Sequence, residues 1–358
     1  MARYKLGVLS GDDIGLEVVP EAVRVMSAVS GISDRIEWVP LPVGYPSYQD
    51  SGETLPQETL KTLDRLDGWI LGPIGHMAYP KDDPKAVNPH PIIRRRYSLH
   101  ANIRPARSYP SVPSLHQDVD LVIVRENNEG FQPDRNMHAG AGEFMPSPDM
   151  AMSVRVITRG NSSFVARAAF DLARQRDQKK RVTIVHKNTV FKLGCGLFAE
   201  SCRAVAKDYP DIAWDEAIVD TFSMKLVMNP QEFDVVVTTN MFGDILSDEA
   251  AGLVGGLGLA PGLCVGPEYV MAQATHGSAP DIAGKGVANP YAMIVSGAML
   301  LSWLGQKHSD PEMEGAGRRI VRAVDRVVEE KRQVTPDLGG SGSTADMTDA
   351  VIEALDEA

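Results

Sequence analysis

Short apolar runs alternate with longer amphipathic or loop segments along this chain, and this alternation restricts the fold more than any other feature. The runs that resemble strands are YKLGVLS, GWILG, VDLVIVRE, RVTIVHK and FDVVVTTN. Between the last three lie FVARAAFDLARQR and LFAESCRAVAKDYP, whose apolar residues recur at helical spacing. Strands that alternate with helices are typical of an α/β fold with a largely parallel sheet.

The length of the chain favours more than one domain. At 358 residues it exceeds what a single hydrophobic core usually serves, so we expect two domains or one large α/β unit. The best candidates for the joins are the Pro- and Arg-rich stretch near residues 99–110 and the glycine run GLVGGLGLAPG at 252–262.

Charge and composition argue against several classes of partner. A formal net charge of −11 would repel the phosphates of a nucleic acid, so we expect a small-molecule partner and no nucleic acid. The N-terminus lacks the apolar core of a signal peptide, and the longest apolar run, near 298–304, is too short to cross a bilayer. We therefore expect no membrane partner and a cytoplasmic location. The three cysteines show no CxxC spacing, which predicts buried thiols rather than a disulfide or zinc framework.

The segment GDDIGLEVVPEA at 11–22 follows a strand and opens a helix, as a dinucleotide-binding loop would. It does not match G-x-G-x-x-G, so the glycines that let a backbone approach a pyrophosphate closely are missing. By itself this segment predicts only a βα turn, without a Rossmann fingerprint.

A basic island interrupts this acidic sequence. Residues 84–117 contain no Asp or Glu but include Lys85, Arg94, Arg95, Arg96, Arg104 and Arg107. One interpretation is a solvated basic face or a subunit contact. The alternative is a pocket for a polycarboxylate, because guanidinium groups bind carboxylates bidentately and stay charged. Arg125 ends the strand VDLVIVRE, and the carboxyl ends of strands are where α/β proteins bind ligands.

Two carboxylates four residues apart stand out in MFGDILSDEAAG at 241–252. Asp244 and Asp248 would share one face of a helix, and a divalent cation such as Mg²⁺ or Mn²⁺ would turn their repulsion into ligation. Asp220 could supply a further oxygen ligand. The alternative is that Asp244 caps the helix and Asp248 is solvated. Lys187, in HKNTVFK, lies at a strand end, where a cation or burial could lower its pKa.

Taken together, the long motifs resemble the metal-dependent β-decarboxylating dehydrogenases, the family of isocitrate, homoisocitrate, 3-isopropylmalate and tartrate or D-malate dehydrogenases. The resemblance covers nearly the whole chain, in order. The motifs that carry it are RRRYSLHANIRPAR (94–107), VDLVIVREN (119–127), VHKNTVFK (185–192), FDVVVTTNMFGDILSDEAAGLVGGLGLAP (233–261), HGSAPDIAGKGVANP (276–290) and TPDLGG (335–340).

This resemblance implies a two-domain fold with an open mixed sheet flanked by helices. A discontinuous cofactor-binding domain would comprise residues 1–101 and 256–358, and a metal, substrate and dimerisation domain would comprise residues 102–255. In this family the catalytic lysine and the first metal aspartate come from the neighbouring subunit, so a homodimer with shared active sites is implied.

The resemblance also implies roles for individual residues. The carboxylates of a di- or tricarboxylate substrate would be bound by Arg94, Arg104 and Arg125. Lys187 and Asp220 would be catalytic, with Lys187 accepting the hydroxyl proton while hydride leaves C2 for the nicotinamide. The ligands of Mg²⁺ or Mn²⁺ would be Asp220, Asp244 and Asp248.

The expected cofactor is NAD rather than NADP. Asp281 matches the position where NAD-using members place an aspartate against the adenosine ribose, and it would repel a 2′-phosphate. For Ile282 alone, simple core packing is the alternative. The residues expected along the cofactor are His276, Gly277, Ser278, Ala279, Asp281, Ile282 and Asn289.

The residues before Arg94 favour a polar group on C3 of the substrate. Isopropylmalate dehydrogenases carry a glutamate and two leucines where this chain has Val87, His90 and Pro91. Asn88 and His90 fall where isocitrate dehydrogenases keep a serine and an asparagine, which favours isocitrate or homoisocitrate, although Pro91 replaces the arginine of homoisocitrate enzymes. Isopropylmalate, tartrate and D-malate remain alternatives. A non-catalytic regulatory subunit is the alternative from another class, but such relatives would be expected to lose a metal aspartate or the lysine.

Departures from the family pattern in three motifs affect the expected site. GDDIGLEV has Asp13 and Leu16 where the family has glycine and proline, and QATHGS has Gln273 where the family has glutamate. In RENNEGFQ, Gln132 replaces the tyrosine that protonates the enol, and a carboxamide cannot supply that proton at neutral pH. We expect hydride transfer to stay competent and the later acid step to be altered, unless His138 supplies the proton.

Overall fold

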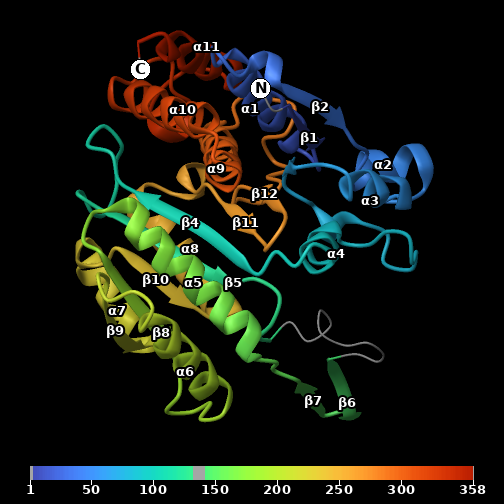
Figure 1. Ribbon diagram of the computed structural model, residues 1–358. Helices are drawn as coiled ribbons and strands as arrows, with labels where there is room; N and C mark the ends of the chain where they lie inside the picture. The colour runs from blue at the N-terminus through green and yellow to red at the C-terminus, as the bar shows by residue number, and fades with distance from the viewer. Residues whose placement is uncertain (1–2, 132–141, 358) are drawn as a thin grey trace.

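The framework of the protein is a single large sheet, seen in a computed structural model that describes residues 3–131 and 142–357 (Figure 1). Gln132 and His138 lie outside the described residues. Across this ten-stranded sheet the order is β2 (Ile36–Pro40), β1 (Tyr4–Leu9), β3 (Gly68–Leu71), β12 (Val270–Ala272), β11 (Leu263–Val265), β4 (Ala101–Arg107), β5 (Asp120–Glu126), β10 (Val235–Thr238), β8 (Arg181–His186) and β9 (Ala213–Ile218).

Helices cover both faces of this sheet. They are α1 (Gly15–Ala28), α2 (Gly44–Ser51), α3 (Gln57–Leu63), α4 (Pro89–Arg96), α5 (Arg159–Arg176), α6 (Gly194–Ala206), α7 (Val219–Met228), α8 (Asn240–Val254), α9 (Tyr291–His308), α10 (Pro311–Glu329) and α11 (Thr344–Leu355). Short 3₁₀ turns are η1 (Ser33–Arg35), η2 (His76–Ala78), η4 (Pro230–Glu232), η5 (Leu257–Leu259) and η6 (Pro336–Leu338).

The two ends of the sheet are parallel and its centre is antiparallel. β2, β1, β3 and β12 form one parallel group, and β5, β10, β8 and β9 form another. Between them, β11 is antiparallel to β12 and β4, and β4 is antiparallel to β5. The predicted α/β class with an open mixed sheet is confirmed, and the parallel strands of the alternating pattern form the two outer groups.

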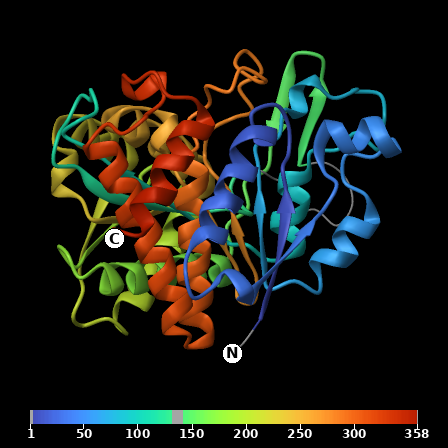
Figure 2. The same cartoon turned by 90° about the horizontal axis from the view of Figure 1, so that it is seen from above.

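Both ends of the chain build one half of the molecule. α1 packs with α9, α10 and α11 in one core over β1 and β3, so the first and last segments lie side by side (Figure 2). α3 and α4 cover the opposite face of the same strands. The middle of the chain builds the other half, with α5 and α6 on one face and α7 and α8 on the other. The domain boundaries at 101 and 256 stay a prediction, because one sheet runs through both halves.

Strand alternation decides which side chains face α8. Val124 of β5 packs with α5 and α6, whereas Ile123 packs with α7 and α8. Since successive strand residues face opposite sides, Arg125 follows Ile123 onto the α8 side. Arg104 of β4 is paired with Ile123 and faces the same way. Two of the predicted substrate arginines therefore point toward the helix that carries the predicted metal aspartates.

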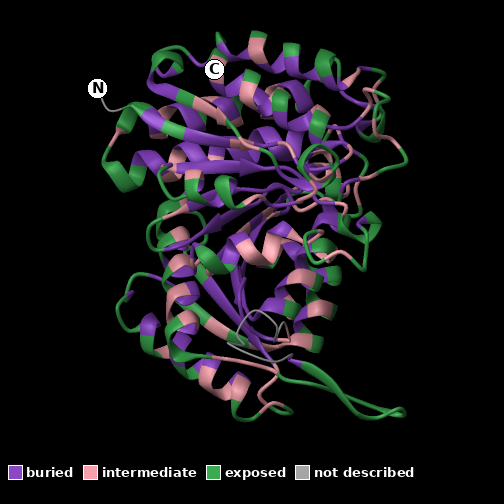
Figure 3. Ribbon diagram, turned by 90° about the vertical axis from the view of Figure 1, so that its right-hand side faces the viewer, coloured by how far each residue is buried: buried purple, intermediate pink, exposed green. Residues whose placement is uncertain are grey.

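A two-stranded hairpin projects from the second half of the molecule. β6 (Glu143–Ser147) and β7 (Met150–Ser153) pair antiparallel, and every residue in them is exposed (Figure 3). A two-stranded hairpin is at best marginally stable alone in water, so this exposed extension lacks the packing that would normally support it.

A buried carboxylate organises the turn between β1 and α1. Asp12 is 3% exposed and accepts hydrogen bonds from the Tyr45 amide at 2.6 Å, the Gly75 amide at 2.7 Å and the Tyr79 hydroxyl at 2.6 Å. The next residue, Asp13, has a left-handed backbone with a φ of 49°. A Cβ added to Gly75 would lie 2.9 Å from the Ser278 hydroxyl and 3.1 Å from the Asp13 carboxylate, so the three loops meet closely here.

The structure also bears on the three cysteines and on the apolar character of the helices. Cys195, Cys202 and Cys264 are buried and free, which confirms the predicted thiols. Among the residues described, no helix combines the length and apolar character needed to cross a membrane.

Asp13→Gly should stabilise the fold, because glycine adopts a left-handed backbone without the steric cost of a Cβ. We expect the free energy of unfolding to rise by about 0.5–1 kcal/mol and the melting temperature by about 1–2 °C. Removing a carboxylate beside Ser278 should also tighten NAD binding, measured by calorimetry.

Asp177→Gly is the matched control, because Asp177 has the same φ of 49° at the end of α5. It should raise the melting temperature and leave NAD affinity unchanged. If Asp13→Gly changes neither stability nor NAD affinity, the loop is not strained.

Candidate active site

A cavity of about 250 Å³ lies between the two halves of the molecule. It is lined by α4, β4, β5 and α8 together with the segment after β12. The residues predicted from the sequence that line it are Asn88, His90, Arg94, Arg104, Arg125, Asp244, His276 and Gly277. The fold therefore gathers substrate, metal and cofactor candidates from distant parts of the chain.

Three arginines give the cavity its charge. Arg94, Arg104 and Arg125 are 7%, 8% and 2% exposed. Buried guanidinium groups are stable only with anionic or strongly polar partners, and Asp244 is the acidic side chain that lines the cavity with them. Positive charge is thus in excess, which favours an anionic ligand and supports the polycarboxylate interpretation of the basic island.

Asp244 is the anion that these arginines share. Arg104 donates to Asp244 Oδ1 at 3.1 Å and to the Ser247 hydroxyl at 2.7 Å. Arg125 also donates to Asp244, and it donates to Asn240 Oδ1 at 2.6 and 3.1 Å. Burial opposes ionisation of Asp244, but Arg125 and Arg104 outweigh it and hold the pKa of this carboxyl below its usual value.

A glycine allows α8 to approach these arginines. A Cβ added to Gly243 would come within 2.6 Å of the Arg125 Cβ, so a larger residue would push the helix away from β5. Asp244 lies in the second turn of α8, whose N-cap is Thr239. The alternative in which Asp244 caps the helix is therefore wrong.

Asp248 lies beside the cavity rather than in its lining. Its Oδ1 is 3.8 Å from Arg104 Nη1, and its side chain is 55% exposed. Burial raises the pKa of Asp248 against the pull of Arg104, and the neighbouring Asp244 raises it further. The carboxylates of Asp244 and Asp248 therefore oppose each other's ionisation, as the sequence suggests, and within one chain Arg104 reduces this effect.

Lys187 and Asp220 lie outside the cavity lining and contact each other. Lys187 Nζ is 2.5 Å from Asp220 Oδ1, and this hydrogen bond lowers the pKa of Asp220. Asp220 is 64% exposed. In the part of the chain that the structure describes, no three His, Cys, Asp or Glu side chains converge on a possible metal position. One chain alone does not assemble the predicted three-aspartate site.

The segment that is expected to bind the cofactor begins at His276, and its first two residues, His276 and Gly277, line the cavity. Burial lowers the pKa of His276, and its Nε2 is buried with no hydrogen-bond partner among the described residues. The Ser278 carbonyl accepts from the Ile14 amide at 3.1 Å, which ties the segment to the β1–α1 turn. A buried nitrogen without a partner at the cavity edge is the chemistry expected where a polar ligand binds.

The other residues that are expected to contact the cofactor differ in how far they are buried. Asp281 is exposed, whereas Ala279 and Ile282 pack partly buried against the core, in line with the alternative for Ile282. Asn289 is buried and bonded to Asp337 at 2.9 Å and to the Tyr291 amide at 2.9 Å. These bonds give Asn289 a structural role in addition to any contact with cofactor.

Sequence reasoning missed Asn240 and Ser247 beside the arginines, and it identified Gln273 only as a departure from the family pattern. Asn240 holds Arg125, Ser247 holds Arg104, and Gln273 accepts from Arg94 Nη2 at 2.7 Å. Helical spacing could have revealed Asn240, which lies four residues before Asp244 and so on the same face. Nothing in the sequence pairs Gln273 with Arg94, because the two residues are 179 positions apart.

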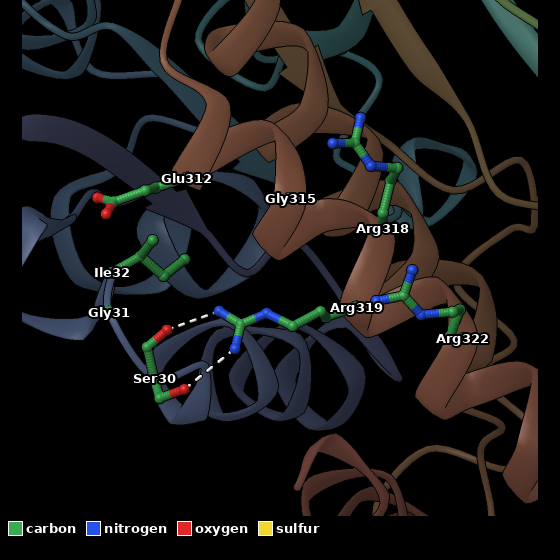
Figure 4. Close-up of a pocket in the computed structure, with 8 residues that line it drawn as sticks. All are labelled: Ser30, Gly31, Ile32, Glu312, Gly315, Arg318, Arg319 and Arg322. Atoms are coloured by element: carbon green, nitrogen blue, oxygen red, sulfur yellow. Dashed lines mark hydrogen bonds between the residues drawn. The ribbon is translucent and has the colours of Figure 1, made fainter. Parts of the chain in front are cut away.

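A second basic surface does not belong to this site. It is a cavity between α10 and the turn after α1, lined in part by Arg318, Arg319 and Arg322, and it contains none of the predicted site residues (Figure 4). Arg319 donates to the Ser30 hydroxyl at 3.0 Å and to its carbonyl at 2.6 Å, so this arginine joins the helix to the turn.

The turn after Arg125 rests on two buried glutamates. Glu126 accepts from the amides of Asn128 at 2.8 Å and Glu129 at 2.7 Å. Glu129 in turn accepts from the amide and hydroxyl of Thr158. Burial raises the pKa of Glu126 to about 7, with the neighbouring Glu129 adding to the rise.

Known proteins resemble this chain over nearly all of its length. A family model described as isocitrate/isopropylmalate dehydrogenase matches residues 5–351. The isocitrate/homoisocitrate dehydrogenase of Thermus thermophilus is 42% identical over 352 residues, 98% of each chain. The 3-isopropylmalate dehydrogenase of Archaeoglobus fulgidus is 40% identical, over 98% of this chain and 99% of that one. The crystal structure of isocitrate dehydrogenase from Methylococcus capsulatus matches with a TM-score of 0.86 at 41% identity, over 98% of this chain and 99% of that one.

Glu126 should make stability fall between acidic and neutral pH. Its folded-state pKa of about 7 lies above the ordinary 4.5, so the folded protein holds this proton more tightly than the unfolded chain. The contribution is fully present below about pH 4.5 and is lost as pH rises through 7. The free energy of unfolding, measured in urea, is compared for the wild type and Glu126→Gln at pH 5 and pH 8. Between these pH values it should fall by up to about 3 kcal/mol more in the wild type than in the variant.

The variant will start from a lower stability, because a carboxamide offers one acceptor oxygen where Glu126 uses two. The comparison therefore rests on the difference between the two pH values. Equal differences in both proteins would show that Glu126 is ionised in the same way in the folded and unfolded states.

Proposed function

Because the chain belongs to the isocitrate/isopropylmalate dehydrogenase family, we propose that it oxidises and decarboxylates a D-malate-type 2-hydroxy acid with a polar C3 substituent, using NAD and a divalent metal. Isocitrate and homoisocitrate are the substrates of this kind that we favour. The observation that carries the proposal is the cavity with three buried arginines around one carboxylate, bordered by polar residues of α4.

The α4 end of the cavity supports a polar C3 group. Asn88 is the N-cap of α4, and its side-chain oxygen accepts from the His90 amide at 3.1 Å. Asn88, His90 and Pro91 line the cavity, whereas Val87 packs partly buried in the core behind it. A branched apolar group would meet polar side chains here, which disfavours isopropylmalate.

Other members of the family remain the alternatives. The similar identities to an isocitrate/homoisocitrate enzyme and a 3-isopropylmalate enzyme do not separate these substrates. Tartrate and D-malate, which lack a large C3 branch, are also alternatives. A regulatory subunit is disfavoured, since the predicted base and metal ligands, Lys187, Asp220, Asp244 and Asp248, are all retained.

The carboxylates of α8 have the chemistry that a hard cation requires. Asp244 and Asp248 supply oxygen ligands from adjacent turns, and Asp220 of a second copy would complete the set. Mg²⁺ or Mn²⁺, when bound, would polarise the substrate hydroxyl and offset the negative charge that develops as CO₂ leaves. The arginines hold the substrate carboxylates, and Lys187 Nζ accepts the hydroxyl proton.

Charge along the cofactor segment favours NAD. Asp281 is exposed, and Asp13 lies close to Ser278 in the same region. Both carboxylates would repel a 2′-phosphate, whereas a ribose hydroxyl can donate a hydrogen bond to Asp281. Cofactor choice and a cytoplasmic location both remain predictions from the sequence.

An apolar stripe on α7 supports a homodimer. Met224, Val227 and Met228 are 53%, 46% and 60% exposed, and their spacing places them on one face of α7 with Asp220. Leaving three large apolar side chains in water is unfavourable, so a second copy of the chain is the occupant that we propose for this face.

A second apolar stripe lies on α8, the helix that packs against α7. Met241 and Ile245 are 37% and 60% exposed and share a face with Asp248. The exposed β6–β7 hairpin adds Phe144 and Met145 as further apolar contacts. Covering both stripes would bring Asp220 of one chain toward the α8 aspartates of the other, which explains why one chain separates them.

The test of the proposed function is a substrate panel. Purified protein should reduce NAD with isocitrate or homoisocitrate faster than with 3-isopropylmalate, D-malate or tartrate. Activity should stop when a chelator removes the metal and return with Mg²⁺ or Mn²⁺. NADP should be the poorer cofactor. Best turnover with isopropylmalate would refute the polar C3 group, and binding without turnover would favour a regulatory subunit.

Shared active sites predict recovery of activity in mixed dimers. Lys187→Met and Asp244→Asn should each inactivate the homodimer. Mixed dimers contain one site in which the intact Asp244 meets the intact Lys187, so a refolded equimolar mixture should regain about a quarter of wild-type activity. Mixing Lys187→Met with Asp220→Asn is the control and should give no recovery, because both residues would belong to the same half of the site. If neither mixture recovers activity, each active site lies within one chain.

A further inference from the structure

Arg155 lies between β7 and α5, and three aromatic rings surround its guanidinium group. The Arg155 Cζ is 5.3, 4.8 and 5.8 Å from the ring centroids of Phe131, Phe191 and Phe242. The rings of Phe131 and Phe191 also meet edge to face, with their centroids 5.6 Å apart. A cation within about 6 Å of a ring centroid is attracted to the ring, so all three rings stabilise the guanidinium group. We call Arg155 and these three rings the aromatic cage.

Hydrogen bonds contribute less to the position of this cation than the rings do. Arg155 Nη2 donates to the Thr239 hydroxyl at 3.4 Å, which is a long bond. Its Nη1 is buried and has no hydrogen-bond partner among the residues that the structure describes. A Cβ added to Gly194 would lie 3.1 Å from Nη1, so the start of α6 also lies against the guanidinium group. The position of the cation and the positions of the rings therefore depend on each other.

Each ring of the aromatic cage comes from a different segment. Phe131 follows the turn after β5, Phe242 lies on α8, and Phe191 belongs to the turn that begins at Lys187, directly after β8. The Phe191 amide donates to the Lys187 carbonyl at 2.9 Å, and the Phe191 carbonyl accepts from the Cys195 amide at 2.9 Å. Phe191 is thus bonded to the backbone of the predicted base on one side and to the start of α6 on the other.

Backbone hydrogen bonds hold Arg155 in this place. The next residue, Val156, exchanges two amide–carbonyl hydrogen bonds with Gly130, at 2.8 and 3.0 Å. Gly130 directly precedes Phe131, so this bridge ties Arg155 to the segment that carries one ring of the aromatic cage. A side chain on an anchored backbone can orient its neighbours reproducibly.

We propose that Arg155 is a positioning residue for Lys187. By holding the Phe191 ring against those of Phe131 and Phe242, the cation fixes the turn from which Lys187 extends. Arg155 is not among the residues that line the cavity, so it acts on the reaction through Lys187. This inference rests on the proposed function, in which Lys187 accepts the hydroxyl proton, and it adds a residue on which that step depends.

Loss of the cation should slow the chemical step and leave binding nearly unchanged. In Arg155→Met, the single-turnover rate of NADH formation at saturating isocitrate or homoisocitrate should fall at least about tenfold, because a misplaced reacting group costs up to about 10²-fold. The KM values for substrate and NAD should change less than about threefold.

Arg174→Met is the matched control for this variant. Arg174 lies in the last turn of α5, and its Cζ is 4.5 Å from the ring centroid of Tyr209. The change therefore removes a similar cation–π contact from the same half of the molecule. It should leave the single-turnover rate unchanged.

Hydrogen exchange reports on the turn without any turnover. The Val190 and Phe191 amides both donate to the Lys187 carbonyl, at 3.1 and 2.9 Å. When the aromatic cage loses its cation, these bonds should open more often. Exchange in residues 187–194 should be at least about tenfold faster in Arg155→Met than in the wild type. Exchange in β8 should stay the same, and Arg174→Met should leave both segments unchanged.

Mixed dimers show which part of a shared site Arg155 serves. Because it acts on Lys187 of its own chain, refolding Arg155→Met with Asp244→Asn should recover about a quarter of wild-type activity. Refolding it with Lys187→Met should give less than about a tenth, since both changes then affect the same part of the site. The reverse result would mean that the aromatic cage acts through α8, and it would overturn the inference.

These measurements separate the inference from the proposed function. If the wild type reduces NAD with no acid of the substrate panel, the proposed function is wrong, and hydrogen exchange alone decides whether Arg155 fixes the turn. If Lys187→Met and Asp244→Asn do not complement each other, the rate and the exchange decide.

Two results would overturn the inference and leave the proposed function intact. One is unchanged exchange or an unchanged single-turnover rate in folded Arg155→Met. The other is a fall in kcat/KM that comes from a higher KM alone, because the aromatic cage would then support binding. Phe191→Leu removes one ring of the cage and repeats the test if Arg155→Met does not fold.

Discussion

The contact of Arg104 and Arg125 with Asp244 is the interaction on which the site depends. It joins the antiparallel centre of the sheet to α8, and it is possible because Gly243 lets the helix lie against Arg125. Arginines this deeply buried would be strongly destabilising without an anion. The same pairing leaves positive charge in excess around the cavity. Stability of the second half and affinity for a polyanion therefore have one physical origin.

The separation of Asp220 from Asp244 has a consequence for assembly. Within the described residues of one chain, the predicted metal ligands do not converge, yet they lie on helix faces that also carry exposed methionines and Ile245. Burial of those apolar faces and completion of the metal site would be the same event. In the proposed homodimer, dimerisation would contribute both to stability and to catalysis, and a monomer would lack both contributions.

Much of the fold could be predicted from the pattern of the sequence. The runs interpreted as strands appear as β1, β3, β5, β8 and β10, and the two strong helical patterns appear as α5 and α6. β11 and β12 were not predicted, because three-residue strands are too short to show a hydrophobic period. The seven-residue strand β4 was not predicted either, because its sequence was interpreted as part of the basic island and as a candidate domain join, although β4 brings Arg104 next to β5. Gln132 and His138 lie outside the described residues, so the altered acid step stays a prediction.

The sequence by itself determined the family, the α/β class and the identity of the charged residues, because these depend on composition, period and motif. Tertiary structure alone decided which charges meet. Arg94 and Gln273 are far apart in the chain, and no local pattern couples an arginine on α4 to a glutamine after β12. The fold also places Lys187 and Asp220 outside the cavity lining, as the resemblance implies for residues that a neighbouring subunit would supply. Local propensity determines secondary structure over a few residues. Which charged side chains contact each other depends on how strands and helices that are distant in sequence pack together.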